Sequence, residues 1–344
     1  MQGGTQGGRV GFYCAVLAHT MWGFFPLYWP FLKPIPPLAL VSHRILWSFA
    51  LLCVVVPVLM TIGWEVSRQR FFSVLSSWRA LGIYALAAAF LQVNWLAFIW
   101  AVNNGNVLQA SLGYYVNPLL SVLLGVLVLG ERLLKIQWIA LAITTVGVCV
   151  MTIAGGGMPW ASLAMATSFA MYGLMKKWTP LRSLSGLWVE ASMLLLPAFF
   201  FLLWTNHLTE TEGVPYSATS WGLLLGGGVL TVAPLALFAV AAKSIPLSTV
   251  GVLQYIGPTL QFIVGAIVMG EPFGIGRMIG FGFVWVGSAL YLISLSRSRN
   301  LPPSPTAPGA PSAEQMKSVS LEINLDESLE TSVEKAGNAE LEGA

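Results

Sequence analysis

The chain has 344 residues, of which 56% are hydrophobic and 9% charged, and its mean hydropathy is +0.75. Soluble globular chains usually carry about 25% charged residues, so the composition excludes a water-soluble enzyme. Charge divides the chain in two. Residues 1–300 hold fifteen basic and six acidic residues, whereas residues 301–344 hold two basic and eight acidic ones. The basic body and the acidic tail therefore belong to different environments.

Apolar runs long enough to cross a bilayer recur along the body. A bilayer core needs about 20 apolar residues at the rise of a helix, and lipid offers the backbone no hydrogen-bond partner outside a helix or a closed barrel. No run alternates as a barrel strand does. The sequence therefore predicts an all-α polytopic membrane protein with ten transmembrane helices. They are expected at residues 10–31, 38–62, 80–102, 108–129, 136–154, 158–177, 186–204, 220–242, 248–269 and 275–295.

The basic residues predict the orientation of these helices. With the N-terminus in the cytoplasm, twelve basic residues fall on the cytoplasmic side and only Lys33, Arg44 and Arg277 on or near the other. Lys and Arg favour the cytoplasmic side of a membrane, so we expect both termini there. The twelve are Arg9, Arg68, Arg70, Arg79, Arg132, Lys135, Lys176, Lys177, Arg182, Lys243, Arg297 and Arg299.

The body contains an internal duplication at an offset of 140 residues. The offset aligns Tyr115 with Tyr255, Pro118 with Pro258, and Gly130-Glu131 with Gly270-Glu271, among other pairs. We therefore expect a short N-terminus at 1–9 and two five-helix repeats at 10–154 and 158–295. Because five is odd, the second repeat must enter the bilayer from the opposite side. Inverted repeats of this kind are typical of alternating-access transporters.

Residues 300–344 form a segment of different character. The segment is rich in proline and acidic residues and has no aromatic residue, which predicts a disordered cytoplasmic tail. Its one regular feature is an apolar residue every fourth position, which leaves open a helix formed on a protein partner. That series is Leu321, Leu325, Leu329 and Val333.

Proline and tyrosine recur at the centres of two predicted helices. Tyr115 and Pro118 share one helical face, and Tyr255 and Pro258 share the equivalent face in the second repeat. A proline removes a backbone hydrogen bond and kinks a helix, which membranes tolerate beside protein or a water-filled cavity. Two interpretations stay open: a central pocket lined by both faces, or close helix packing through small residues.

The predicted helix at 80–102 carries amides near its centre. Gln92, Trp95 and Asn103 follow one face, which offers an amide beside an aromatic wall for an amphipathic small molecule. Asn94 lies on another face. Hydrogen bonds between helices are the alternative explanation for these amides.

Two charged residues lie at least one helical turn inside predicted spans. Arg44 either extends its side chain to the outer interface or faces the cavity, where a guanidinium binds a carboxylate or a phosphate. Glu190 is a counter-ion for a basic residue, a proton carrier that couples transport to the proton gradient, or a hydrated carboxylate at a helix end. Glu131 and Glu271 each follow a glycine at a helix end, where a solvated or helix-capping role fits.

Motifs for other chemistries do not occur in the sequence. It has no P-loop, no zinc-protease motif, no nucleophile elbow and no cluster with metal-ligand spacing. We therefore expect no enzyme, no cofactor, no metal site and no nucleic-acid partner. A lipid bilayer and a small solute are the expected partners.

Six segments of the body carry distinctive residue patterns, at 22–23, 42–49, 94–104, 110–118, 129–132 and 254–259. These segments closely resemble the RarD family, in the EamA branch of the drug/metabolite transporter superfamily. The resemblance covers about residues 9–297 and implies ten helices in two EamA repeats, a bacterial inner-membrane location and export of small molecules. Its recurrent segments coincide with a set of candidate substrate-binding residues, namely Arg44, Asn94, Trp95, Asn103, Asn117, Pro118, Gln254, Tyr255 and Pro258.

The sequence therefore predicts a secondary transporter, an exporter by resemblance, of a small metabolite or drug-like solute. In this prediction the two inverted halves rock around a pocket at the midplane. The alternative is a non-transporting membrane scaffold or sensor that acts through the tail. The sequence specifies neither the substrate nor the oligomeric state.

Overall fold

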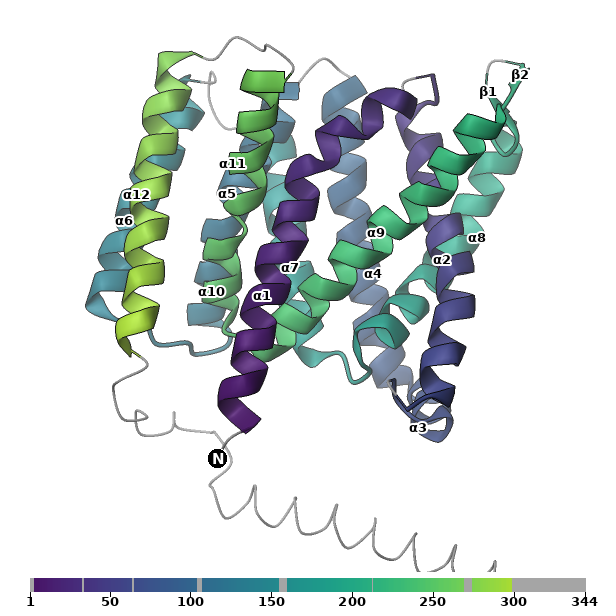
Figure 1. Cartoon of the computed structure of the whole chain (residues 1–344), viewed down its shortest axis with the longest axis horizontal. Coiled ribbons are helices and arrows are strands. Elements are labelled where there is room, and N and C mark those ends of the chain that lie inside the picture. Colours follow the sequence, from purple (N-terminus) through teal and green to yellow (C-terminus); the bar gives the residue numbers. More distant parts are fainter. Residues whose placement is uncertain are drawn as a thin grey trace, which may run out of the picture. The chain divides into compact units, whose positions relative to one another are not determined.

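The computed structural model shows the body of the chain as a bundle of long helices (Figure 1). It describes residues 3–32, 34–63, 65–103, 107–154, 160–211, 213–268 and 274–298, so the tail predicted at 300–344 lies outside the described residues. The first half holds α1 (Gly3–Phe24), the short 3₁₀ helices η1 (Phe25–Leu27) and η2 (Trp29–Leu32), α2 (Pro37–Thr61), α3 (Arg68–Leu75), α4 (Trp78–Asn103), α5 (Val107–Leu127) and α6 (Lys135–Ala154). The second half holds α7 (Trp160–Trp178), α8 (Ser183–Trp204), the strands β1 (Glu210–Thr211) and β2 (Val214–Pro215), α9 (Ala218–Ser244), α10 (Leu247–Leu253), α11 (Ile256–Ile263), the π-helix η3 (Val264–Val268) and α12 (Ile275–Ser298).

The prediction of an all-α polytopic membrane fold is confirmed. Seven of the described helices are long and apolar enough to cross a membrane: α1, α2, α4, α6, α8, α9 and α12. The other three predicted ranges correspond to α5, α7 and the run from α10 to η3, which a turn at Gln254 and Tyr255 interrupts. The count of ten spans stays a prediction. Two features were not expected from the sequence, namely the short helix α3 and the two-residue hairpin of β1 and β2.

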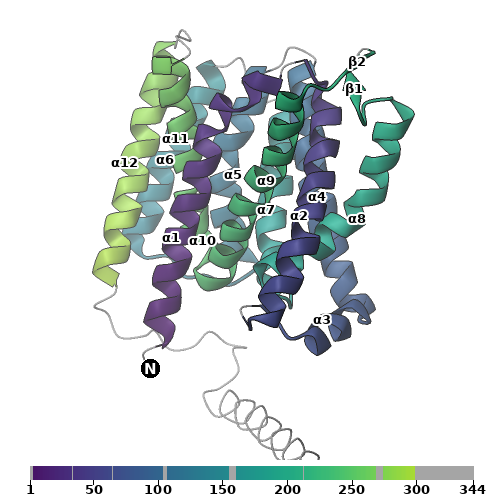
Figure 2. The same ribbon diagram turned by 45° about the vertical axis from the view of Figure 1, so that its right-hand side comes forward.

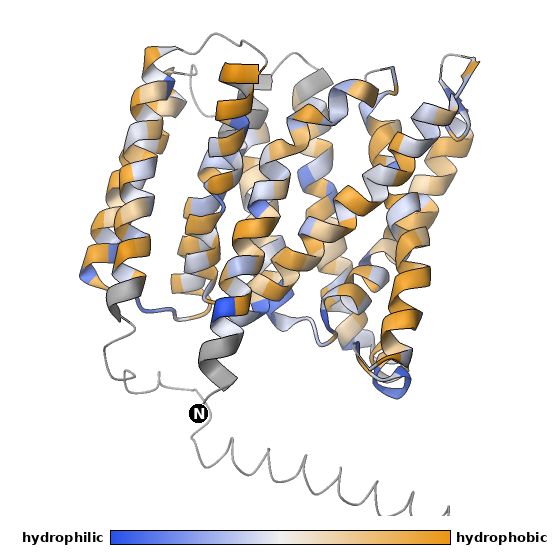
Figure 3. Cartoon of the chain, in the orientation of Figure 1, coloured by the Kyte–Doolittle hydropathy of each residue, from blue (hydrophilic) through white to orange (hydrophobic). Residues whose placement is uncertain are grey.

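The surface of the bundle suits lipid. Figure 3 shows apolar residues along the lengths of the helices and hydrophilic ones gathered near their ends, as at α3. Large apolar side chains point outward, among them Ile153, which is 77% exposed, and Ile267, which is 78% exposed. Contiguous apolar surface of this extent marks a membrane or protein contact. Figure 1 places the start of α1, α3 and the end of α12 at one end of the bundle and the hairpin of β1 and β2 at the other.

Two central prolines affect their helices differently. Pro118 lies within the continuous helix α5, whereas Pro258 follows a break between α10 and α11. Pro258 has no N–H to donate to the carbonyl of Gln254, and the N–H of Gly257 donates to that carbonyl instead at 3.2 Å. The break places Gln254 and Tyr255 in a turn near the middle of the bundle.

Helix packing follows a symmetric pattern between the two halves (Figure 2). Helix α5 packs on α7, and its counterpart is the packing of α1 on α10 and α11. The packing of α4 on α7 corresponds to the packing of α9 on α1. The contacts of α2 with α8 and of α5 with α10 join equivalent helices of the two halves. Such pairing is what a two-fold relation between the halves requires.

Glycines of α6 and α12 repeat this symmetry at the level of single residues. A Cβ built on Gly147 would lie 2.6 Å from the carbonyl oxygen of Gly280, and one built on Gly287 would lie 2.6 Å from that of Ala140. At the offset of 140, Gly147 corresponds to Gly287 and Ala140 to Gly280. Both contacts are backbone against backbone, so only glycine permits the close approach.

Replacement of Gly287 by alanine is expected to destabilise the bundle. The added methyl group meets a backbone carbonyl that cannot turn aside, and overpacking of this kind costs about 1–3 kcal/mol. Gly282→Ala is the matched control, because a Cβ there meets nothing within 4 Å on the same helix. Thermal unfolding in detergent micelles should show a lower midpoint for Gly287→Ala alone. Equal midpoints for the two variants would contradict the packing described for α6 and α12.

Candidate functional site

A cavity with an empty volume of about 380 Å³ lies among α2, α4, α8 and α9. Two of these helices belong to the first half of the body and two to the second. Most of the lining is aliphatic, and the polar contributions come from Ser48, Glu190 and Thr231. The lining residues are Ile45, Ser48 and Leu52 of α2, Leu91 and Trp95 of α4, Leu187, Glu190, Ala191 and Leu194 of α8, and Thr231, Val232 and Leu235 of α9.

Arg44 contacts two elements of the cavity wall. Its Nε donates a hydrogen bond of 2.9 Å to the hydroxyl oxygen of Thr231. Its guanidinium carbon lies 4.8 Å from the ring centre of Trp95 and 5.0 Å from that of Trp29. The Thr231 hydroxyl itself donates to the carbonyl of Gly227 at 2.7 Å, so its lone pairs are free to accept from Arg44. This geometry favours the cavity interpretation of Arg44 over extension to the interface.

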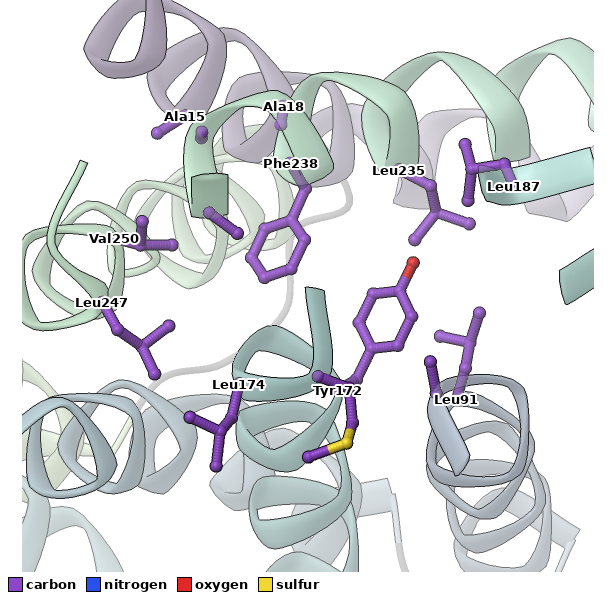
Figure 4. Close-up of a cluster of buried hydrophobic side chains, with 14 of the residues drawn as sticks. Ala15, Ala18, Leu91, Tyr172, Leu174, Leu187, Leu235, Phe238, Leu247 and Val250 are labelled. Carbon is purple, nitrogen blue, oxygen red and sulfur yellow. The ribbon is translucent and has the colours of Figure 1, made fainter. Parts of the chain in front are cut away.

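Glu190 forms a buried ion pair with Lys176. Lys176 is 1% exposed and Glu190 is 2% exposed. The hydroxyl of Tyr172 donates to the second carboxylate oxygen of Glu190 at 3.2 Å. Tyr172 and Lys176 are four residues apart and share one face of α7, and the Lys176 ammonium lies 5.2 Å from the Tyr172 ring centre. Figure 4 shows the Tyr172 hydroxyl pointing toward Leu187 and Leu235, which line the cavity.

The ion pair bears on the interpretations of Glu190. The structure shows the counter-ion arrangement, and the burial of both side chains excludes a hydrated carboxylate in this conformation. Lys176 was not recognised as a site residue from the sequence, because a lysine near a helix end is also the expected pattern of a cytoplasmic boundary. Its spacing of four residues from Tyr172 was the one available signal.

The polar and aromatic side chains that the sequence singled out on α4 do not meet at one site. The Asn94 side chain donates to the carbonyl of Met165 on α7 at 2.8 Å, which is a hydrogen bond between helices. Trp95 lines the cavity. Gln92 is partly buried, and its side-chain oxygen has no hydrogen-bond partner among the described residues. The side chain of Asn103 lies outside the described residues.

The helix faces that carry Tyr115, Pro118, Tyr255 and Pro258 do not line the cavity among α2, α4, α8 and α9. Pro118 and Tyr255 line a second cavity of about 210 Å³. The hydroxyl of Tyr255 donates to the carbonyl of Tyr115 at 3.2 Å, and a Cβ on Gly251 would lie 2.8 Å from the carbonyl oxygen of Pro118. The close approach of α5 and α10 therefore brings these faces together as a packed contact beside a small void.

A polar cluster joins α5 to the turn between α10 and α11. The Ser121 hydroxyl lies 3.5 Å from Asn117 Oδ1 and 3.4 Å from Gln254 Oε1. All three side chains are buried, and the Gln254 nitrogen has no partner among the described residues. Pro258 is also buried, on α11. None of these four residues lines either cavity.

Glu131 caps a helix of the other half. Its carboxylate accepts hydrogen bonds from the backbone N–H groups of Leu247 at 2.5 Å and Ser248 at 2.8 Å. These are the free donors at the start of α10, where a negative charge is favourable. Gly130, with φ +66°, turns the chain so that Glu131 reaches them. The capping role is the one that the structure shows, and Glu271 lies outside the described residues.

Comparison with known proteins gives consistent matches over the body. The sequence matches the profile of the EamA-like transporter family at residues 9–153 and 156–293. It is 42% identical over 282 residues to an uncharacterized transporter, YojE, of Bacillus subtilis, covering 82% of this chain and 93% of that protein. It is 39% identical over 314 residues to a RarD protein of Streptomyces exfoliatus, covering 89% and 97%. A solved crystal structure with 19% identity aligns with a TM-score of 0.63 over 83% of this chain and 98% of that chain, which shows likeness of fold.

Breaking the Lys176–Glu190 pair is expected to destabilise the protein strongly. Removing one partner leaves the other charge buried without compensation, at a cost of about 3–5 kcal/mol. Lys176→Met and Glu190→Gln should each unfold at lower temperature in detergent micelles, and the double variant should recover part of the loss. Lys135→Met, at an exposed position on α6, is the control. Losses that simply add in the double variant would show that the two side chains act independently.

Proposed function

The chain belongs to the EamA-like transporter family, and on this premise we propose that it carries a small solute across the bacterial inner membrane by alternating access. It is a multi-pass membrane protein of a transporter family. The proposal adds the mechanism, the location in the inner membrane and the place where the solute binds.

The cavity among α2, α4, α8 and α9 is the observation that carries the proposal. Charged residues within membrane helices are rare and usually face a water-filled path or a binding site. Here Glu190 lines the cavity, and Arg44 contacts two residues of its wall, Thr231 and Trp95. Helices of both halves form its wall, so a movement of one half against the other would open it.

The symmetric contacts support alternating access. Two inverted five-helix repeats at 10–154 and 158–295 would have two equivalent ways to pack, one open to each compartment. The paired glycine contacts of α6 and α12 and the matched packing of α1 and α7 are what such repeats would produce. The twelve basic residues support a cytoplasmic position for both termini, and the resemblance to RarD proteins supports export.

The site in this proposal centres on Arg44, Trp95 and Glu190. Pro118, Tyr115 and Tyr255 would act where the two halves move against each other, because they join α5 to the second half. Asn117 and Gln254 belong to the same contact through Ser121. Glu190 is the candidate for proton coupling, since a proton on its carboxylate would remove its attraction to Lys176.

Accessibility of the cavity from both sides of the membrane tests alternating access. In protein whose three native cysteines are replaced, Ala191→Cys places a thiol on the cavity wall. A membrane-impermeant maleimide should label it in vesicles of either orientation. Leu196→Cys, 62% exposed on the same helix, should resist the polar reagent because it faces lipid. Labelling of Ala191→Cys from one side only, under every condition, would contradict the mechanism.

The same thiol reports on proton coupling. If Glu190 carries the coupling proton, lowering the pH weakens its pairing with Lys176 and shifts the balance between the two open states. The labelling rate of Ala191→Cys should then change with pH, and Glu190→Gln, assayed below its lowered unfolding temperature, should abolish that change. A pH response that survives Glu190→Gln would rule out this carboxylate as the proton carrier.

A further inference from the structure

We propose that the solute is a small carboxylate with an apolar body and that Arg44 binds its anionic group. This rests on the proposed transport function for its physiological meaning, but the binding itself is measurable without transport. Three features of the cavity carry the inference: its charge balance, the unused donors of Arg44, and the character of its remaining wall.

The charges at the cavity do not cancel. Glu190 is neutralised by Lys176 in the buried pair, which leaves the positive charge of Arg44. The other acidic residues that the structure describes have different positions. Glu65 accepts from Ser185 at 2.8 Å, Glu131 caps α10, and Glu210 belongs to the hairpin. Arg44 contacts the cavity wall through Thr231 and Trp95 and has no counter-ion among the described residues, which favours entry of an anion.

Arg44 presents free donors. A guanidinium has five N–H groups in a rigid fork that matches the two oxygens of a carboxylate. In the part of the chain that the structure describes, the Nε–H alone has an acceptor, which is Thr231. Trp29 and Trp95 occupy positions near the guanidinium at 5.0 and 4.8 Å, where aromatic rings attract the cation without using its N–H groups. The donors on the two terminal nitrogens therefore remain for a ligand.

The aliphatic part of the cavity lining favours a ligand whose non-ionic part is apolar. Aliphatic side chains from all four helices line it, including Ile45, Leu91, Leu187 and Val232. One negative charge balances Arg44, whereas a second would find no unpaired positive charge at the cavity among the described residues. A carboxylate therefore fits better than a doubly charged phosphate.

Binding of matched probes to the full-length protein in lipid nanodiscs tests the proposal. The probes are 3-phenylpropionate and 3-phenylpropanamide, which share a shape and differ in charge. Isothermal titration calorimetry should give affinity at least about tenfold higher for the acid, as expected for a charge-assisted hydrogen bond. Arg44→Gln should remove this preference. Arg79→Gln is the control, since Arg79 lies over the ring of Trp78 at an exposed site.

A second variant keeps the test decisive if Arg44→Gln fails to fold. Arg44→Lys retains the charge but lacks the planar fork, so the acid should still bind better than the amide by a smaller factor. Equal binding of the two probes, a preference unchanged in the Arg44 variants, or tighter binding of phenyl phosphate would each overturn the inference. Absence of binding by either probe would also overturn it.

Failure of the inference and failure of the transport proposal give different results. If Ala191→Cys is labelled from both sides but the acid shows no Arg44-dependent binding, alternating access stands and the carboxylate inference falls. If the acid binds through Arg44 but Ala191→Cys is reached from one side only, the binding site stands and the transport mechanism falls.

Discussion

The buried ion pair between Lys176 and Glu190 determines the electrostatics of the whole cavity. Two charges that are almost fully removed from solvent are tolerated only because each satisfies the other. Tyr172 adds a hydrogen bond to the same carboxylate, so α7 and α8 are held in one register. Because Glu190 is already neutralised, it does not compensate Arg44. The net charge that an incoming solute meets is therefore set by a pair that the solute need not touch.

Close contacts between small residues govern how the helices approach one another. Lipid tails are as apolar as leucine, so helices in a membrane gain little from hydrophobic contact alone and associate through close packing and hydrogen bonds. Gly147 and Gly287 allow backbone contact between α6 and α12, and Gly251 allows it between α10 and α5. These glycines lie at the contacts that join the two halves. The duplication thus preserves the places where backbones meet as well as the apolar pattern.

The sequence predicted the helices well because lipid leaves the backbone few alternatives. It also singled out Arg44 and Glu190 as candidates, since charged residues within apolar runs stand out against their surroundings. Glu190 and Trp95 line one cavity, and Arg44 contacts its wall through Thr231 and Trp95. The partner of Glu190 was not predicted, because a long lysine side chain near a helix end is expected to reach the interface. The target of Glu131 was also missed. A carboxylate that caps a helix 116 residues further along the chain leaves no local pattern to read.

Hydrogen-bond satisfaction separates structural polar residues from those available to a solute. Asn94, Tyr255 and Glu131 each find protein partners across helices, and a ligand would have to break these bonds to use them. Arg44 differs because Thr231 takes one donor and the tryptophan rings take none. Donors that find no acceptor among the described residues are unfavourable in hydrocarbon, and in the proposed binding mode an anion would satisfy them. A carboxylate with an apolar body satisfies the donors and covers the aliphatic wall at once, whereas water does only the first. Under the proposal, such a solute would give both the guanidinium and the aliphatic wall a suitable partner.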